Sequence, residues 1–194
     1  MEVDKIEVKR NIRRCAALLA TAALFAGSVY ALEINDVYDV NVASGASQTI
    51  SEAITGSGSI RKTGAGTLVL SGANTFTGGV SVEAGRVEVA ATGALGSGPV
   101  AITSTGASGS GNVRFTVAGT FANTISVTGA GGSKDYPQLV FTKAVTLTGA
   151  ITSGCNLFFY GDVDSCPDVT IDASVTAAGC VVGGSVRAHY KWIR

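Results

Sequence analysis

Polar and apolar side chains alternate one by one along short stretches of this chain, and glycines separate the stretches. The clearest case is residues 60–89, IRKTGAGTLVLSGANTFTGGVSVEAGRVEV. Its apolar positions fall in pairs two residues apart, namely Leu68 and Leu70, Val80 and Val82, and Val87 and Val89. Because successive side chains of a strand point to opposite faces, each pair predicts a half-buried strand. Arg86 and Glu88 then face outward, and no window of this stretch has helical spacing.

Weaker copies of the same alternation occur before this stretch and after it, up to the C-terminal part. They cover residues 38–43, 100–103, 112–117, 124–128, 139–142 and 144–152. Clusters of turn residues recur about every 20 residues, which is typical of a solenoid whose coils bury one another's apolar faces. The pattern therefore predicts an all-β solenoid. An antiparallel β-sandwich built on glycine-rich hairpins is the alternative.

Many fixed offsets within residues 60–89 agree with one known repeat. The matching residues are Lys62, Gly64, Gly66, Thr67, Leu68, Leu70, Gly72, Asn74, Thr75, Phe76, Thr77, Gly78, Gly79, Val82, Gly85 and Val87. The stretch resembles the autotransporter-associated β-strand repeat, found in the passenger regions of large bacterial surface proteins. In that repeat, tyrosine is commoner at Phe76 and leucine is commoner at Val87. The resemblance implies a right-handed parallel β-helix, and it implies no catalytic residues.

Composition agrees with an all-β repeat protein with small turn residues and argues against other classes. Charged residues make up 14% of the 194 residues, 26 residues are glycine, and the formal net charge is zero. Disorder requires low hydrophobicity or high net charge, and neither applies. Nucleic-acid binding requires a basic patch or stripe, which this sequence lacks. We therefore expect neither disorder nor a nucleic-acid partner.

Residues 1–31 have the features of a secretory signal peptide. A basic start precedes the apolar run AALLATAALFAG at 16–27, and Val29-Tyr30-Ala31 places small residues at the positions that signal peptidase requires. Cleavage is expected near Ala31, with the secretion machinery as a partner and the bacterial surface, outer envelope or medium as the destination. An uncleaved membrane anchor is the alternative, although the apolar run is short for a membrane span.

The remaining chain divides into three expected regions. Residues 32–55 are predicted to form an N-terminal cap, and residues 56–154 the β-helix repeat region with its best copy at 60–89. Residues 155–194 form a segment richer in cysteine, aspartate and aromatic residues. Autotransporters end in a long translocator barrel, for which this chain has no room. We expect either a short exported relative or a fragment of a longer protein.

The C-terminal segment contains the weak candidates for chemistry. Asp162 and Asp164 lie two residues apart, so on a strand both carboxylates would share one face. Acidic clusters on β-helices bind calcium or cleave glycosidic bonds. Solvated turn aspartates are the simpler interpretation, because no basic partner lies close in sequence. The sequence predicts no catalytic, cofactor or metal residues, and Phe158, Phe159 and Tyr160 are expected to be core and capping bulk.

The cysteines leave two possibilities open. Cleavage near Ala31 leaves Cys155, Cys166 and Cys180, and an exported protein meets an oxidising compartment. A Cys155–Cys166 disulfide would close a short loop that carries the aspartate pair. Three buried thiols that pack as small apolar side chains are the alternative.

The favoured function is an exported, non-enzymatic structural or surface-display module without cofactors. One alternative is an adhesin that binds surface glycans or envelope components along the side of the stack. Another is a β-helix polysaccharide lyase or glycoside hydrolase that uses the Asp162 and Asp164 region. A repeat whose fixed residues are glycines and apolar strand positions explains shape rather than chemistry, which favours the first function.

Overall fold

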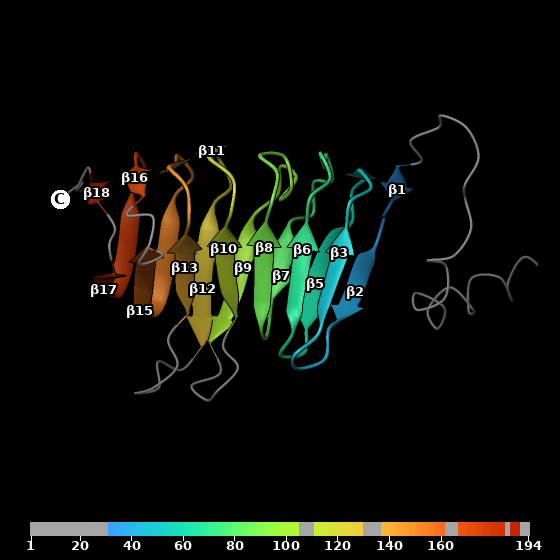
Figure 1. The fold of residues 1–194 in the computed structure, drawn as a ribbon, viewed down its shortest axis with the longest axis horizontal. Helices are drawn as coiled ribbons and strands as arrows, with labels where there is room; N and C mark the ends of the chain where they lie inside the picture. The colour runs from blue at the N-terminus through green and yellow to red at the C-terminus, as the bar shows by residue number, and fades with distance from the viewer. Residues whose placement is uncertain (1–30, 105–110, 130–136, 162–166, 185–186, 191–194) are drawn as a thin grey trace, which may run out of the picture.

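Parallel strand pairing between successive coils defines this fold (Figure 1). The computed structural model describes residues 31–104, 111–129, 137–161, 167–184 and 187–190. Within these residues the chain is all β with no helix, and it winds into a solenoid of about 6 turns. Every strand pair in the described ranges is parallel. The predicted parallel β-solenoid is confirmed, and the antiparallel sandwich is wrong.

The strands of the coils lie on three faces, which we call A, B and C; the strands of face C form two separate sheets, β1–β4 and β11–β14–β16–β18. Face A contains β2 (Val37–Asn41), β5 (Ser59–Thr63), β7 (Val80–Val82), β9 (Val100–Ser104), β12 (Ile125–Gly129) and the first parts of β15 (Ile151–Gly161) and β17 (Val175–Gly184). Face B contains β3 (Ser47–Ile50), β6 (Thr67–Leu70), β8 (Arg86–Val89), β10 (Asn112–Phe115), β13 (Gln138–Phe141) and the second parts of β15 and β17. Face C contains β1 (Leu32–Glu33), β4 (Ile54–Thr55), β11 (Gly119–Phe121), β14 (Val145–Leu147), β16 (Asp168–Ile171) and β18 (Arg187–Tyr190).

The core is a set of apolar columns that run along the solenoid axis. On face A, one column consists of Ile60, Val80, Val100, Ile125 and Ile151. On face B, in-register pairing stacks Leu68, Val87, Val113, Leu139 and Phe159. All ten of these side chains are buried. The predicted inward faces of the strands in residues 60–89 are therefore confirmed, and each coil covers the apolar face of its neighbour.

Aromatic rings fill the core of face B toward the C-terminal end. Phe115 and Phe141 occupy the same register position in adjacent coils, and their rings stack with centroids 5.3 Å apart. The next residue in that register is Gly161, which has no side chain. The ring of Phe159 stacks on Phe141 instead, with centroids 6.4 Å apart. Stacked aromatic rings contribute attraction beyond the area they bury.

Coil length changes along the stack while the strands stay in register. Ile60 pairs with Val80 and Val80 pairs with Val100, so these two coils each step by 20 residues. Val100 pairs with Ile125 and Ile125 with Ile151, which are steps of 25 and 26 residues. The longer connections therefore leave the strand stack intact.

Glycine is required where two coils approach most closely. Gly79 has a φ of +87°, and a Cβ there would lie 2.1 Å from the Pro99 carbonyl oxygen of the next coil. Such a contact excludes any side chain, and the positive φ strains any residue other than glycine. Gly79 thus allows the backbone of one coil to pack directly on the next.

Several predictions concern residues beyond the described ranges. The signal peptide over residues 1–31 lies outside them except for Ala31, so the cleavage site stays a prediction. The boundary expected at 154/155 falls inside β15, and the division into regions stays a prediction too. No helix in the described ranges is long and apolar enough to span a membrane.

Candidate functional site

The structure does not describe the acidic residues that the sequence suggested as weak candidates for chemistry. Asp162, Asp164 and Cys166 lie outside the described residues. Asp168 and Asp172, which follow them, are exposed on and just after β16. In the described ranges, no group of three His, Cys, Asp or Glu side chains comes together as a metal site would require.

Cys155 lies inside the core at the irregularity of β15. Its side chain is buried, and its Sγ lies 3.8 Å from the Ser153 Oγ. The Ser153 hydroxyl donates to the Cys155 carbonyl oxygen at 2.7 Å. Because Cys166 is outside the described ranges, the Cys155–Cys166 disulfide stays a prediction, which thiol counting on unfolded, unreduced protein would test.

Lys62 is fully buried in the core, with 0% of its surface exposed. It occupies the inward column of face A between Val40 of the preceding coil and Val82 of the next. Its Nζ donates hydrogen bonds to the carbonyl oxygens of Thr63 at 2.7 Å, Gly64 at 2.6 Å and Ala84 at 3.1 Å. An ammonium group has three donors, so its hydrogen-bonding capacity is filled.

Burial sets the electrostatics of this lysine. Desolvation lowers the pKa of Lys62 below its ordinary value of 10.5. The carbonyl oxygens are those of the turn that leads from face A to face B, in the same coil and in the following one. The role supported by this geometry is to hold that turn, and not to serve as a nucleophile or base, because no open surface reaches the nitrogen.

Asn74 is the second buried polar side chain in this region, and it links three coils. Its Oδ1 accepts a hydrogen bond from the Ile54 N–H at 2.8 Å, and its Nδ2 donates to the Ala94 carbonyl oxygen at 2.6 Å. Ile54 and Ala94 each lie 20 residues from Asn74, one coil to either side. The sequence showed Lys62 and Asn74 only as motif positions, and their contacts inside the core were not foreseen.

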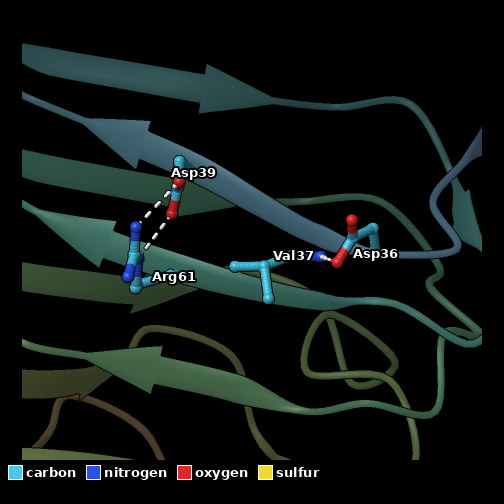
Figure 2. Close-up of polar contacts among 4 residues, drawn as sticks. All are labelled: Asp36, Val37, Asp39 and Arg61. Atoms are coloured by element: carbon cyan, nitrogen blue, oxygen red, sulfur yellow. Dashed lines mark hydrogen bonds and ion pairs between the residues drawn. The ribbon is translucent and has the colours of Figure 1, made fainter. Parts of the chain in front are cut away.

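The outer side of face A changes from charged to uncharged along the axis. Asp39 and Arg61 form a bidentate pair between β2 and β5, with Nε to Oδ1 at 2.5 Å and Nη2 to Oδ2 at 2.8 Å (Figure 2). Figure 2 also shows the Asp36 carboxylate accepting a hydrogen bond from the Val37 N–H at 2.8 Å. These side chains are exposed, so the ion pair contributes little to stability.

Further along face A, small hydroxyl side chains take over. Ser126, Thr152 and Thr176 follow one another in register on β12, β15 and β17. They border a shallow hollow of about 460 Å³ at a place where Gly129 and Gly154 carry no side chains. The hollow has no charged or aromatic lining, so it offers little for specific recognition.

The outer side of face B differs, because it bears aromatic and charged side chains. Register places Arg86, Asn112, Gln138 and Phe158 in one column. Glu88, Arg114, Val140 and Tyr160 form the column beside it. Arg114 Nη1 lies 3.8 Å from Glu88 Oε2. Face B is therefore the chemically most varied outer surface in the described part of the chain.

The aromatic triplet 158–160 does not behave as one unit. Phe159 is fully buried, as predicted, but Tyr160 is 41% exposed and Phe158 is only half-buried. The expectation that all three are core and capping bulk is wrong for Tyr160. In a strand, neighbours must point to opposite faces, so burial of Phe159 directs both flanking rings outward.

Comparison with known proteins identifies the repeat region. A family of passenger-associated transport repeats matches residues 60–89. Residues 60–89 are thus similar to a passenger-associated-transport-repeat. This repeat spans most of β5 and all of β6, β7 and β8, and it contains both Lys62 and Asn74. The predicted resemblance to an autotransporter passenger repeat is thus confirmed.

One curated relative extends the comparison to a named protein. The chain is 44% identical over 48 residues to the adhesin BmaC autotransporter of Brucella suis biovar 1 (strain 1330). The match covers 25% of this chain but only 1% of that adhesin. No solved structure matches the chain.

Proposed function

We propose that this chain is an exported passenger module that displays a rigid β-solenoid at the bacterial surface, with an adhesive and non-enzymatic role. The signal peptide would be cleaved near Ala31 by the secretion machinery. The passenger-associated-transport-repeat at 60–89 and the similarity to an autotransporter adhesin support this destination.

One observation carries the non-enzymatic part of the proposal. The two polar side chains buried inside the repeat, Lys62 and Asn74, have their donors and acceptors engaged by main-chain groups of adjacent coils. Catalytic groups need access to substrate and a functional pKa, and these two residues have no such access. The outer surface of the repeat is the part that a binding partner can reach.

Display can be tested on intact cells. The full chain is expressed in a Gram-negative host, and the cells are treated with a membrane-impermeant biotin reagent. We expect the chain to be labelled, with an N-terminus at Leu32 by Edman sequencing. Recovery of the unlabelled chain from the cytoplasm, with a cytoplasmic marker as control, would contradict the proposal.

A second assay addresses catalysis. The purified protein is incubated with acidic and neutral polysaccharides, with and without calcium, while new reducing ends and unsaturated products are measured. We expect no turnover. Turnover that disappears in a doubly substituted Asp162→Ala and Asp164→Ala variant of unchanged stability would establish an enzyme instead.

A further inference from the structure

The strongest unexplained feature of the described surface is the exposed tyrosine of face B. Tyr160 and Val37 are the two large apolar side chains exposed in the described part of the chain. Tyr160 has Phe158 two residues away on the same outward face of β15, half-buried. An exposed tyrosine beside a half-buried phenylalanine, on a surface whose other outward side chains are mostly polar or charged, indicates an interaction site.

Polar groups continue from these rings along the solenoid axis. Gln138 is in register with Phe158, Asn112 with Gln138, and Arg86 with Asn112. Adjacent strands lie about 4.8 Å apart, so these four rungs span roughly 14 Å in a straight line. We call Arg86, Asn112, Gln138, Phe158 and Tyr160 the face B strip.

The strip carries the positive charge of Arg86, for which the described residues show no ion-pair partner. Arg114 is paired with Glu88, whereas neither ion pair found in the described residues includes Arg86. The Arg86 Nε is also buried without a hydrogen-bond partner in that part of the chain. A guanidinium group fits a carboxylate through two parallel hydrogen bonds, so the charge of Arg86 favours an anionic ligand.

The shape of the strip favours a linear ligand. Small molecules require concave pockets that bury most of their surface. The strip instead follows the outer side of paired strands, and the described hollow of about 460 Å³ is on face A. An added peptide strand is excluded at this face, because its main-chain groups already pair between coils. Recognition must therefore come from side chains.

From these observations we infer that the face B strip binds a linear acidic glycan lying along the solenoid axis. Phe158 and Tyr160 pack against the CH face of a sugar ring, Asn112 and Gln138 contact its hydroxyl groups, and Arg86 binds a uronate carboxylate. This inference rests on the proposed adhesive function and assigns it a ligand class and a surface.

Binding of the purified full chain to three immobilised polymers tests the inference. The polymers are polygalacturonate, its fully methyl-esterified form and poly-L-glutamate. We expect polygalacturonate to bind and the other two to bind at least about tenfold more weakly, since each lacks either the carboxylate or the sugar ring. Equal binding of poly-L-glutamate would show a plain charge effect or an acidic protein partner. Equal binding of the methyl ester would remove the role of Arg86, and either result overturns the inference.

Substitutions locate the site. Arg86→Gln and Tyr160→Ala are each expected to weaken polygalacturonate binding by at least about tenfold, while Tyr160→Phe retains it. Arg61→Gln is the matched control, because Arg61 is an outward arginine on face A already paired with Asp39. Loss of binding in the Arg61 control, or unchanged binding in both strip variants, would overturn the assignment to face B. Circular dichroism and thermal unfolding confirm that each variant is folded.

Failure of this inference is distinguishable from failure of the proposed function. Surface labelling of intact cells reports display, and it does not depend on any glycan. A labelled protein that binds none of the polymers would overturn the glycan assignment alone, whereas an unlabelled cytoplasmic protein would overturn the proposed function.

Discussion

The Lys62 Nζ lies 3.1 Å from the Ala84 carbonyl oxygen, which belongs to the turn of the following coil. The same nitrogen contacts two carbonyl oxygens of its own turn. A single buried side chain thus joins two successive turns between faces A and B. This arrangement explains why a lysine occupies a core column whose neighbours are Val40 and Val82.

Replacing this lysine should destabilise the protein. Lys62→Met keeps an apolar chain of similar length but removes the hydrogen bonds to the carbonyl oxygens of Gly64 and Ala84, and one of the two that reach the Thr63 carbonyl oxygen. We expect a loss of about 1–3 kcal/mol in the free energy of unfolding, measured by chemical denaturation. Lys143→Met, at an exposed lysine, serves as the control and should change stability little. A Lys62 variant as stable as the parent would show that the contacts contribute nothing.

The lowered pKa of Lys62 predicts a pH dependence with a definite sign. Below 10.5 the unfolded chain binds the lysine proton more readily than the folded protein does. The free energy of unfolding should therefore rise with pH toward 10.5 and fall as pH decreases through the folded pKa. Subtracting the curve of Lys62→Met from that of the parent isolates this lysine. If the free energy of unfolding of the parent falls relative to that of Lys62→Met as pH rises, the prediction is contradicted.

Asn74 should stabilise the protein through its two hydrogen bonds to adjacent coils. Asn74→Ala leaves the Ile54 N–H and the Ala94 carbonyl oxygen unpaired in the core. We expect a loss of at least about 2 kcal/mol, because each unsatisfied buried group costs about 1–3 kcal/mol. Asn41→Ala, at an exposed asparagine on β2, is the control. Equal stabilities of the two variants would rule out the role assigned to Asn74.

A core substitution tests the assignment of strand faces. Leu70→Ala removes a fully buried side chain of β6 and should cost about 2–5 kcal/mol. Val69→Ala, on the outward side of the same strand, should cost much less. Thermal or urea unfolding of both variants gives the comparison. A larger loss of stability in Val69→Ala than in Leu70→Ala would mean that the buried and outward faces of β6 are exchanged.

Local sequence was sufficient to predict the strands and their buried faces. Leu68, Leu70, Val87 and Val89 are buried as their alternation indicates, because the two-residue period of a strand is a property of the backbone. The same period places Lys62 on the inward side with Ile60. Composition argues against that position, because a lysine is almost never fully buried unless its charge is paired.

Only the tertiary structure decided which coils lie together and at what register. Coil steps vary between 19 and 26 residues, so sequence spacing could not align Arg86 with Asn112, Gln138 and Phe158 on one outer column. Nor could it show that the carbonyl oxygens of Thr63, Gly64 and Ala84 converge on one nitrogen. The alternation of a strand is set by the chain itself. The contacts across coils depend on how the loops bring distant segments into register, and that is a property of the stack as a whole.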